Sequence, residues 1–224
     1  MALILSIESA TDHCSVCVSE KEEVLAYKAA EEKFQHGQQL TLFIQSVLKS
    51  AQLSLKDMDA IAISGGPGSY TALRIGTATA KGICFALDKP LIAIPSLQAL
   101  ALQAARLKPD AKHFCSMIDA RRMEVYTATY DYLLDEKEVA KALIVTADAF
   151  DHLEGDIVFC GNGAEKCKTV LQKPNSHFLT FGCDARYLAP LAFKAFQGSK
   201  FEHLAYYAPF YLKPPNITTP KKRL

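Results

Sequence analysis

The chain has 224 residues, and 50% of them are hydrophobic, which is enough for one large domain or two small ones. Its 25 basic and 24 acidic residues leave a formal net charge of +1. A protein that holds a long stretch of nucleic acid by its phosphates normally has a basic surplus or a basic stripe. The charge balance therefore argues against a free-standing nucleic-acid binder. The basic cluster Lys221, Lys222 and Arg223 is interpreted as a solvated terminus.

The cellular compartment is predicted from the N-terminus and the cysteines. Met1–Ile7 is apolar, but Glu8 follows too soon for a signal peptide, and no apolar run approaches the ~20 residues of a membrane helix. Seven cysteines stand in apolar segments, as is typical of reduced core thiols. Cys14 and Cys17 have Cys-x-x-Cys spacing, but in a strand their side chains point to opposite faces. We therefore expect a cytoplasmic protein with no membrane partner and no metal or redox pair.

Hydrophobic periodicity predicts the elements of the first half of the chain. Three short strands joined by polar turns come first, and two helices then alternate with two strands before a last helix. The expected ranges are strands at Leu3–Ile7, Cys14–Ser19 and Val24–Ala29, a helix at Gln38–Ala51, a strand at Asp59–Ser64, a helix at Tyr70–Leu87, a strand at Leu91–Ile94 and a helix from Pro95-Ser96 to Leu107.

The second half repeats this order, and its C-terminal prolines predict an extended tail. Three hairpin-linked strands followed by helical crossovers imply a mixed sheet with helices on its faces. The expected ranges are strands at Phe114–Ile118, Val125–Tyr132 and Ala142–Val145, a short helix from Thr146 through Phe150, a strand at Ile157–Cys160, a helix at Ala164–Leu171, a strand at His177–Leu179 and a helix at Ala185–Phe196.

The predicted fold class is therefore α/β, with two tandem units of mixed sheet flanked by helices. The units are expected at residues 1–107 and 108–224, the second with an extended tail. This arrangement resembles the actin, sugar kinase and Hsp70 superfamily, whose units are RNase H-like. Such a resemblance of fold does not by itself give a function.

The most informative segment runs from Ile63 to Gly76 and reads as strand, glycine-rich turn and helix. Its glycines permit close backbone approach, and Ser69 is expected to cap the helix and leave N–H groups that can hold an anion. The usual phosphate motifs fail here, because the chain has no Gly-Lys-Ser/Thr and Thr71 stands where the dinucleotide fingerprint needs glycine. As a generic phosphate loop the segment is a weak signal.

As a family signature the same segment is specific. The run Gly66–Gly82 closely resembles the signature of the TsaB (YeaZ) family. Further similar blocks cover nearly the whole chain, least well between Asp131 and Lys200. These blocks are Ile4–Thr11, His36 before its helix, Ile94–Leu100, Asp119–Tyr126 and Pro209–Pro215.

The resemblance implies a non-catalytic subunit in bacterial tRNA threonylcarbamoyladenosine synthesis. The related catalytic subunit, TsaD, carries a His-x-x-x-His metal pair on a helix that corresponds to Ser96–Ala104, which contains no histidine here. No two of the six histidines are three or four residues apart, so we expect no such helical metal pair, no catalytic residue and no cofactor.

The resemblance also implies partners. The chain is expected to bind and activate a TsaD-like subunit, to help recruit a TsaE-like ATPase and to meet tRNA only through the complex. The same surface is expected to allow a homodimer. The expected interface residues are Leu40, Phe43, Val47, Tyr70, Leu73, Arg74 and Thr77.

The alternative is a small kinase or ATPase of the same superfamily. Glu8 lies where many actin-like ATPases have an acidic residue, although a strand-end carboxylate explains it as well. Gly161-Asn162-Gly163 follows a strand where relatives place a nucleotide loop, and is also a common turn. A peptidase label attached to this family is a third possibility, but no Ser-His-Asp spacing supports it. The candidate nucleotide-binding residues are Glu8, Gly66, Gly68, Ser69, Gly161 and Gly163.

Overall fold

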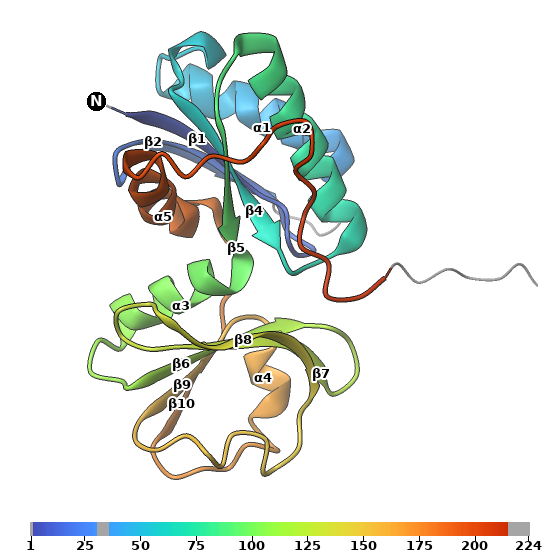
Figure 1. Cartoon of the computed structure of the whole chain (residues 1–224), viewed down its shortest axis with the longest axis vertical. Coiled ribbons are helices and arrows are strands. Elements are labelled where there is room, and N and C mark those ends of the chain that lie inside the picture. Colours follow the sequence, from blue (N-terminus) through green and yellow to red (C-terminus); the bar gives the residue numbers. More distant parts are fainter. Residues whose placement is uncertain (1, 31–35, 215–224) are drawn as a thin grey trace, which may run out of the picture.

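The structure is a computed structural model that describes residues 2–30 and 36–214, and it contains two five-stranded mixed sheets (Figure 1). The first sheet has the order β3-β2-β1-β4-β5 and the second the order β10-β9-β6-β7-β8. In each sheet the first three strands pair antiparallel and the other two add parallel, which confirms the predicted fold class. The strands are β1 Leu3–Glu8, β2 Ser15–Glu20, β3 Glu23–Ala29, β4 Ala60–Gly66, β5 Leu91–Pro95, β6 His113–Asp119, β7 Glu124–Tyr130, β8 Glu136–Ile144, β9 Ile157–Cys160 and β10 Ser176–Leu179.

Helices cover both faces of the first sheet. The helices are α1 His36–Ser50, α2 Tyr70–Leu87, α3 Ser96–Leu107, α4 Ala164–Cys167 and α5 Ala185–Gln197, with a 3-10 turn η1 at Leu55–Asp57. α1 and α2 lie side by side on one face and α5 lies on the other (Figure 1). Alternate residues of β1 serve the two cores: Leu5 and Ile7 pack toward α1, and Ile4 packs toward α5.

The two cysteines with Cys-x-x-Cys spacing follow the same alternation. Cys14 belongs to the core beneath α1, whereas the Cys17 thiol donates to the carbonyl of Ala185 in α5 at 3.3 Å. Both are free thiols on opposite faces, as predicted. Burial raises the pKa of the Cys17 thiol to about 12. Neither the geometry nor the acidity suits a redox pair.

The last helix of each half packs on the other half's sheet. α3 covers β6, β7 and β9 of the second sheet, and α5 returns to cover the first sheet. At the start of α5, the Asp184 carboxylate accepts bonds from the Tyr27 hydroxyl at 2.6 Å and from the backbone N–H of Arg186 at 2.9 Å. The apolar faces of α3 and α5 are therefore buried across the expected boundary between residues 107 and 108.

Three expected elements differ from the structure by more than two residues or do not form. The segment from Thr146 to Phe150 forms turns instead of a helix, and α4 ends at Cys167, four residues before Leu171. β8 starts at Glu136, where the sequence predicted a strand only from Ala142, because its exposed edge position leaves its first half polar. The tail residues Pro215, Pro220, Lys221, Lys222 and Arg223 lie outside the described residues.

Residues 198–214 form a C-terminal strap that joins both units. The backbone N–H of Glu202 donates to the carbonyl of Leu91 in β5 at 2.8 Å. The backbone N–H of Phe210 donates to the carbonyl of Gly65 in β4 at 2.8 Å. The strap therefore covers the open edge of the first sheet. Its end reaches the second unit, where Lys213 pairs with Glu124.

Candidate functional site

The outer face of α1 and α2 has few charges for a helical surface in water. Six positions of α2 are exposed, and Arg74 is the one charged residue among them. Among the exposed positions of α1 whose side chains the structure describes, Lys49 is likewise the one charged residue. A solvent-facing helix normally carries charged and polar residues on its outer side. The exposed positions of α2 are Thr71, Arg74, Ala78, Gly82, Phe85 and Ala86.

Two large apolar side chains stand out on this outer face. Leu42 of α1 is 59% exposed, and Phe85 of α2 is 83% exposed. Ala78 and Gly82 are also exposed on α2, and a Cβ added to Gly82 would meet no atom within 4 Å. Exposed apolar residues beside small ones, with few charges, are features of surfaces that bind another protein.

The predicted interface residues divide between this face and the core. Tyr70 and Arg74 are accessible, and the Arg74 guanidinium donates to the Tyr70 hydroxyl at 3.2 Å. The other five are buried in the chain, because they lie on the apolar sides of the two helices that pack on the sheet. The buried members are Leu40, Phe43, Val47, Leu73 and Thr77.

The glycine-rich loop packs against the protein's own backbone. A Cβ on Gly68 would lie 2.2 Å from the carbonyl oxygen of Ala10, and one on Gly66, whose φ is +101°, would lie 2.4 Å from that of Phe210. The N–H of Ser69 donates to the Ala10 carbonyl at 2.7 Å. Ser69 is the N-cap as predicted, but its side chain makes no capping bond. Gly68 packs against the backbone of Ala10 and Gly66 against the backbone of the strap, so each position has room only for a residue without a side chain.

The second candidate loop is arranged similarly. Gly161 has a φ of +109°, and a Cβ added to it would lie 2.3 Å from the carbonyl oxygen of Met117 in β6, while one added to Gly163 would lie 3.1 Å from the same oxygen. Asn162 Oδ1 accepts from the N–H of Asp119 at 3.0 Å. Lys166 of α4 pairs with Asp119, so this cation is already engaged within the chain.

The hairpin between β6 and β7 has a special backbone. Arg121 and Arg122 both have positive φ, at 73° and 50°. The Asp119 carboxylate accepts from the N–H of Arg121 at 2.7 Å, which supports the turn. Asp119 pairs with Lys166 and Glu124 pairs with Lys213, so both carboxylates of the hairpin are engaged within the chain.

The region between the two loops is apolar. Ala10 and Leu73 of the first unit belong to one buried cluster with Leu100, Ile118 and Cys160. Among the described residues, no group of three His, Cys, Asp or Glu side chains is placed to hold a metal ion. The two glycine-containing loops are therefore separated by packed apolar side chains.

Glu8 is fully buried at the end of β1. Its Oε1 accepts from the N–H of Ala10 at 2.5 Å, and its Oε2 has no hydrogen-bond partner in the described part of the chain. Burial raises the pKa of Glu8 from its ordinary 4.5 to about 7, and the bond from Ala10 opposes this only in part. A carboxyl group that is neutral below pH 7 and sealed from solvent is poorly suited to organise a metal and phosphates.

The raised pKa of Glu8 predicts an unusual pH dependence of stability. Between pH 4.5 and 7 the unfolded chain loses this proton while the folded chain keeps it, so the free energy of unfolding falls as the pH rises. The full loss is about 3 kcal/mol, reached above pH 7. We expect Glu8→Gln to flatten this slope in urea unfolding measured from pH 5 to pH 8.5, and an unchanged slope would contradict the assignment.

Two proteins named TsaB are similar to this chain in sequence. The tRNA threonylcarbamoyladenosine biosynthesis protein TsaB of Escherichia coli is 32% identical to the chain over 166 residues, which cover 71% of each protein. The TsaB of Buchnera aphidicola is also 32% identical, over 74% of this chain and 81% of that protein. The chain belongs to the TsaB family.

Two further comparisons agree with membership of the TsaB family. The family described as "TsaD: tRNA N6-adenosine threonylcarbamoyltransferase" matches residues 24–220. The solved structure of YeaZ from Pseudomonas aeruginosa matches with a TM-score of 0.82 and 27% identity, over 95% of this chain and 100% of that one. The two sheets and their helices are thus the actin-like fold that TsaB, YeaZ and TsaD proteins share.

The sequence analysis did not identify the exposed apolar residues on the outer face of α1 and α2. Leu42 and Phe85 do not fall at the helical spacing of the buried residues that define each helix. That phase difference was itself the available signal: Leu42 sits between Leu40 and Phe43, on the side that should be polar. Ala78 and Gly82 carry no such signal, since small residues are common on any face.

Proposed function

We propose that this chain is a non-catalytic adaptor in tRNA threonylcarbamoyladenosine synthesis, which binds a TsaD-like catalytic subunit through the outer face of α1 and α2. The observation that carries the proposal is this face itself, with its few charges and its exposed Leu42 and Phe85. A TsaD-like protein shares the fold, so it can present a matching pair of helices. Four helices packed in this way would bury both apolar side chains.

The adaptor acts through binding energy. A partner that binds one conformation of the catalytic subunit better than others shifts the population toward that conformation. The chain needs no nucleophile or metal of its own for this role. We expect the same surface to form a homodimer when the catalytic subunit is absent, because an apolar face is costly to leave in water.

Further partners are proposed from the family resemblance. The complex would recruit a TsaE-like ATPase and would act in the cytoplasm. Because the net charge is only +1, the chain would meet tRNA through the complex and not alone. Among the described residues, none of the helices combines the length and apolar character needed to cross a membrane.

The ATPase alternative depends on Glu8 and the two glycine loops. Glu8 is buried and its pKa is about 7, and the Cα atoms of Gly68 and Gly163 face backbone of the same chain. These observations favour packing roles, and we therefore place the adaptor first. ATP binding by the isolated chain would favour the alternative.

The test is to mix the purified chain with the TsaD-like subunit of the same cell and to analyse the mixture by size-exclusion chromatography. The adaptor proposal expects a stable complex and no ATP hydrolysis by the chain alone. Absence of a complex, together with ATP turnover by the isolated chain, would replace the proposal with the ATPase alternative.

A further inference from the structure

The hairpin between β6 and β7 carries two adjacent arginines at its tip. Arg121 and Arg122 are both exposed, and both have positive φ, a backbone conformation that residues with a side chain seldom adopt. Glycine and asparagine adopt it more readily, so the shape of the turn does not call for arginine at either position. Ala120 and Met123 beside them are half-buried, so no exposed apolar residue accompanies the arginines in this turn.

The charge around this tip is positive. The two carboxylates of the hairpin are each engaged by a lysine, Asp119 by Lys166 of α4 and Glu124 by Lys213 of the strap. Among residues 2–30 and 36–214, neither arginine of the tip takes part in an ion pair. The hairpin and its partners thus bring together four cations and two carboxylates, in a chain whose formal net charge is only +1. Two exposed guanidinium groups side by side favour a partner with several negative charges.

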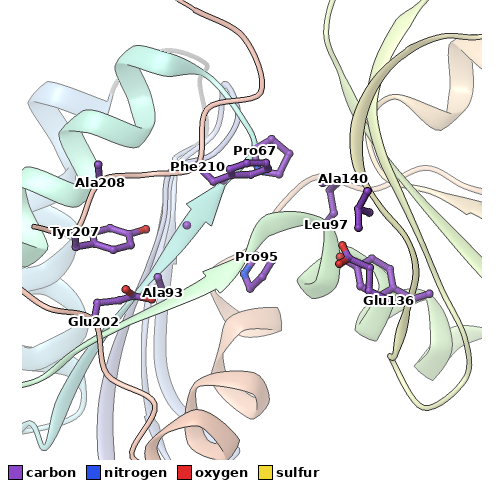
Figure 2. A pocket seen from close by; sticks show the side chains of 14 residues that line it. Pro67, Ala93, Pro95, Leu97, Glu136, Ala140, Glu202, Tyr207, Ala208 and Phe210 are labelled. Atoms are coloured by element: carbon purple, nitrogen blue, oxygen red, sulfur yellow. The ribbon is translucent and has the colours of Figure 1, made fainter.

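The strap places this hairpin beside the start of α2. Figure 2 shows Phe210 of the strap and Pro67 of the glycine-rich loop on the same side of a cavity lined by both units. The next strap residue, Tyr211, packs its ring on that of Tyr70, the first residue of α2, with the ring centroids 4.7 Å apart. Lys213, which pairs with the hairpin, follows two residues later, and two residues span at most about 7 Å. The hairpin therefore lies next to the end of the partner face at which α2 begins.

An RNA backbone fits the tip better than a protein surface does. Phosphate contacts are made by exposed cations and need no apolar neighbour. Protein interfaces have an apolar centre, which the tip lacks and which the outer face of α1 and α2 already supplies through Leu42 and Phe85. A guanidinium group also binds the oxygens of one phosphate in pairs, which gives arginine an advantage in such contacts.

We propose that the tip of the β6–β7 hairpin binds the phosphate backbone of tRNA held by the TsaD-like subunit, through Arg121 and Arg122. Two phosphate contacts are too few to hold tRNA on the isolated chain, in agreement with its small net charge. In the complex they add to the contacts of the catalytic subunit, because both proteins then bind the same RNA molecule. This inference rests on the adaptor function and adds a direct tRNA contact to it.

The test is the affinity of the complex between the chain and the TsaD-like subunit for an unmodified tRNA transcript. Fluorescence anisotropy would measure it from about 50 to about 200 mM salt. Arg121→Asn and Arg122→Asn are combined in one variant, because asparagine tolerates positive φ while the cation is lost. This hairpin variant should bind tRNA at least about ten-fold more weakly at the lowest salt, and the slope of log affinity against log salt should fall by about 2.

The matched control combines Arg106→Asn and Lys108→Asn, which remove the same charge. Both residues are exposed and precede β6, whereas the hairpin follows it, so the length of that strand, about 20 Å, lies between the two sites. The control should leave the tRNA affinity and the salt slope unchanged. Equal weakening by the control and the hairpin variant would mean general attraction of RNA to positive charge and would overturn the proposal.

Size-exclusion chromatography of the same proteins separates this proposal from the adaptor function. The hairpin variant should form the complex with the TsaD-like subunit as well as the wild-type chain does. A normal complex with unchanged tRNA affinity and salt slope would overturn the hairpin contact alone, whereas no complex with the wild-type chain would overturn both proposals. Weaker binding of the TsaD-like or TsaE-like protein, with unchanged tRNA affinity, would assign the two arginines to a protein contact instead.

Discussion

Gly68→Ala is expected to lower the free energy of unfolding by about 3 kcal/mol, a large loss for one methyl group. The new Cβ would lie 2.2 Å from the Ala10 carbonyl oxygen and 2.9 Å from its carbonyl carbon, and these backbone atoms cannot rotate away. The Ser69 N–H bond to the same carbonyl would also be displaced. Urea denaturation, followed by circular dichroism, measures the change.

Gly82→Ala is the matched control for this prediction. Gly82 lies on the outer face of α2, and a Cβ there would meet no atom within 4 Å. Alanine is a better helix former than glycine, so this change should raise the free energy of unfolding by about 1 kcal/mol. Equal effects at Gly68 and Gly82 would contradict the close packing described for the glycine-rich loop.

The second large effect concerns the partner surface. We expect Phe85→Lys to weaken binding of a TsaD-like subunit by at least about 100-fold, because an ammonium group would be buried in an apolar contact. The fold should remain intact, since Phe85 is 83% exposed and a cation near the end of a helix is favourable. Leu42→Lys should behave in the same way, and surface plasmon resonance measures both.

The control for the surface is Tyr132→Lys. Tyr132 is an exposed aromatic residue, at 64%, in the turn between β7 and β8 of the second unit. The same change of charge there should leave the affinity for the TsaD-like subunit unaltered. If Phe85→Lys binds as well as the Tyr132→Lys control, the outer face of α1 and α2 is not the interface.

Much of the fold could be predicted from the sequence, because its signals are local. Alternating residues define β1 and β2, and the helical spacing of α2 gave its bounds, Tyr70–Leu87, as the structure has them. The exchange of α3 and α5 could not be predicted in this way. An apolar helix face shows that it is buried, but not which sheet buries it.

The candidate site was predicted less well. The family resemblance points to the first two helices as the interface, but it does not say which of their side chains face outward, and Phe43 and Val47 lie in the core. Glu8 and Gly68 were chosen by position in the fold, and their contacts with Ala10 appear only in three dimensions. Close approach of one backbone segment to another produces no repeating pattern of residue types, so it cannot be predicted from hydrophobic periodicity.

The central claim, that the chain promotes catalysis by another subunit without contributing catalytic groups, is tested most directly by reconstitution. The TsaD-like and TsaE-like proteins of the same cell, supplied with a threonylcarbamoyl donor and ATP, would be assayed for threonylcarbamoyladenosine formation on tRNA, with the chain, without it, and with Phe85→Lys. The adaptor account predicts modification only with the wild-type chain, and strongly reduced modification with the variant. Full modification without the chain would contradict the account.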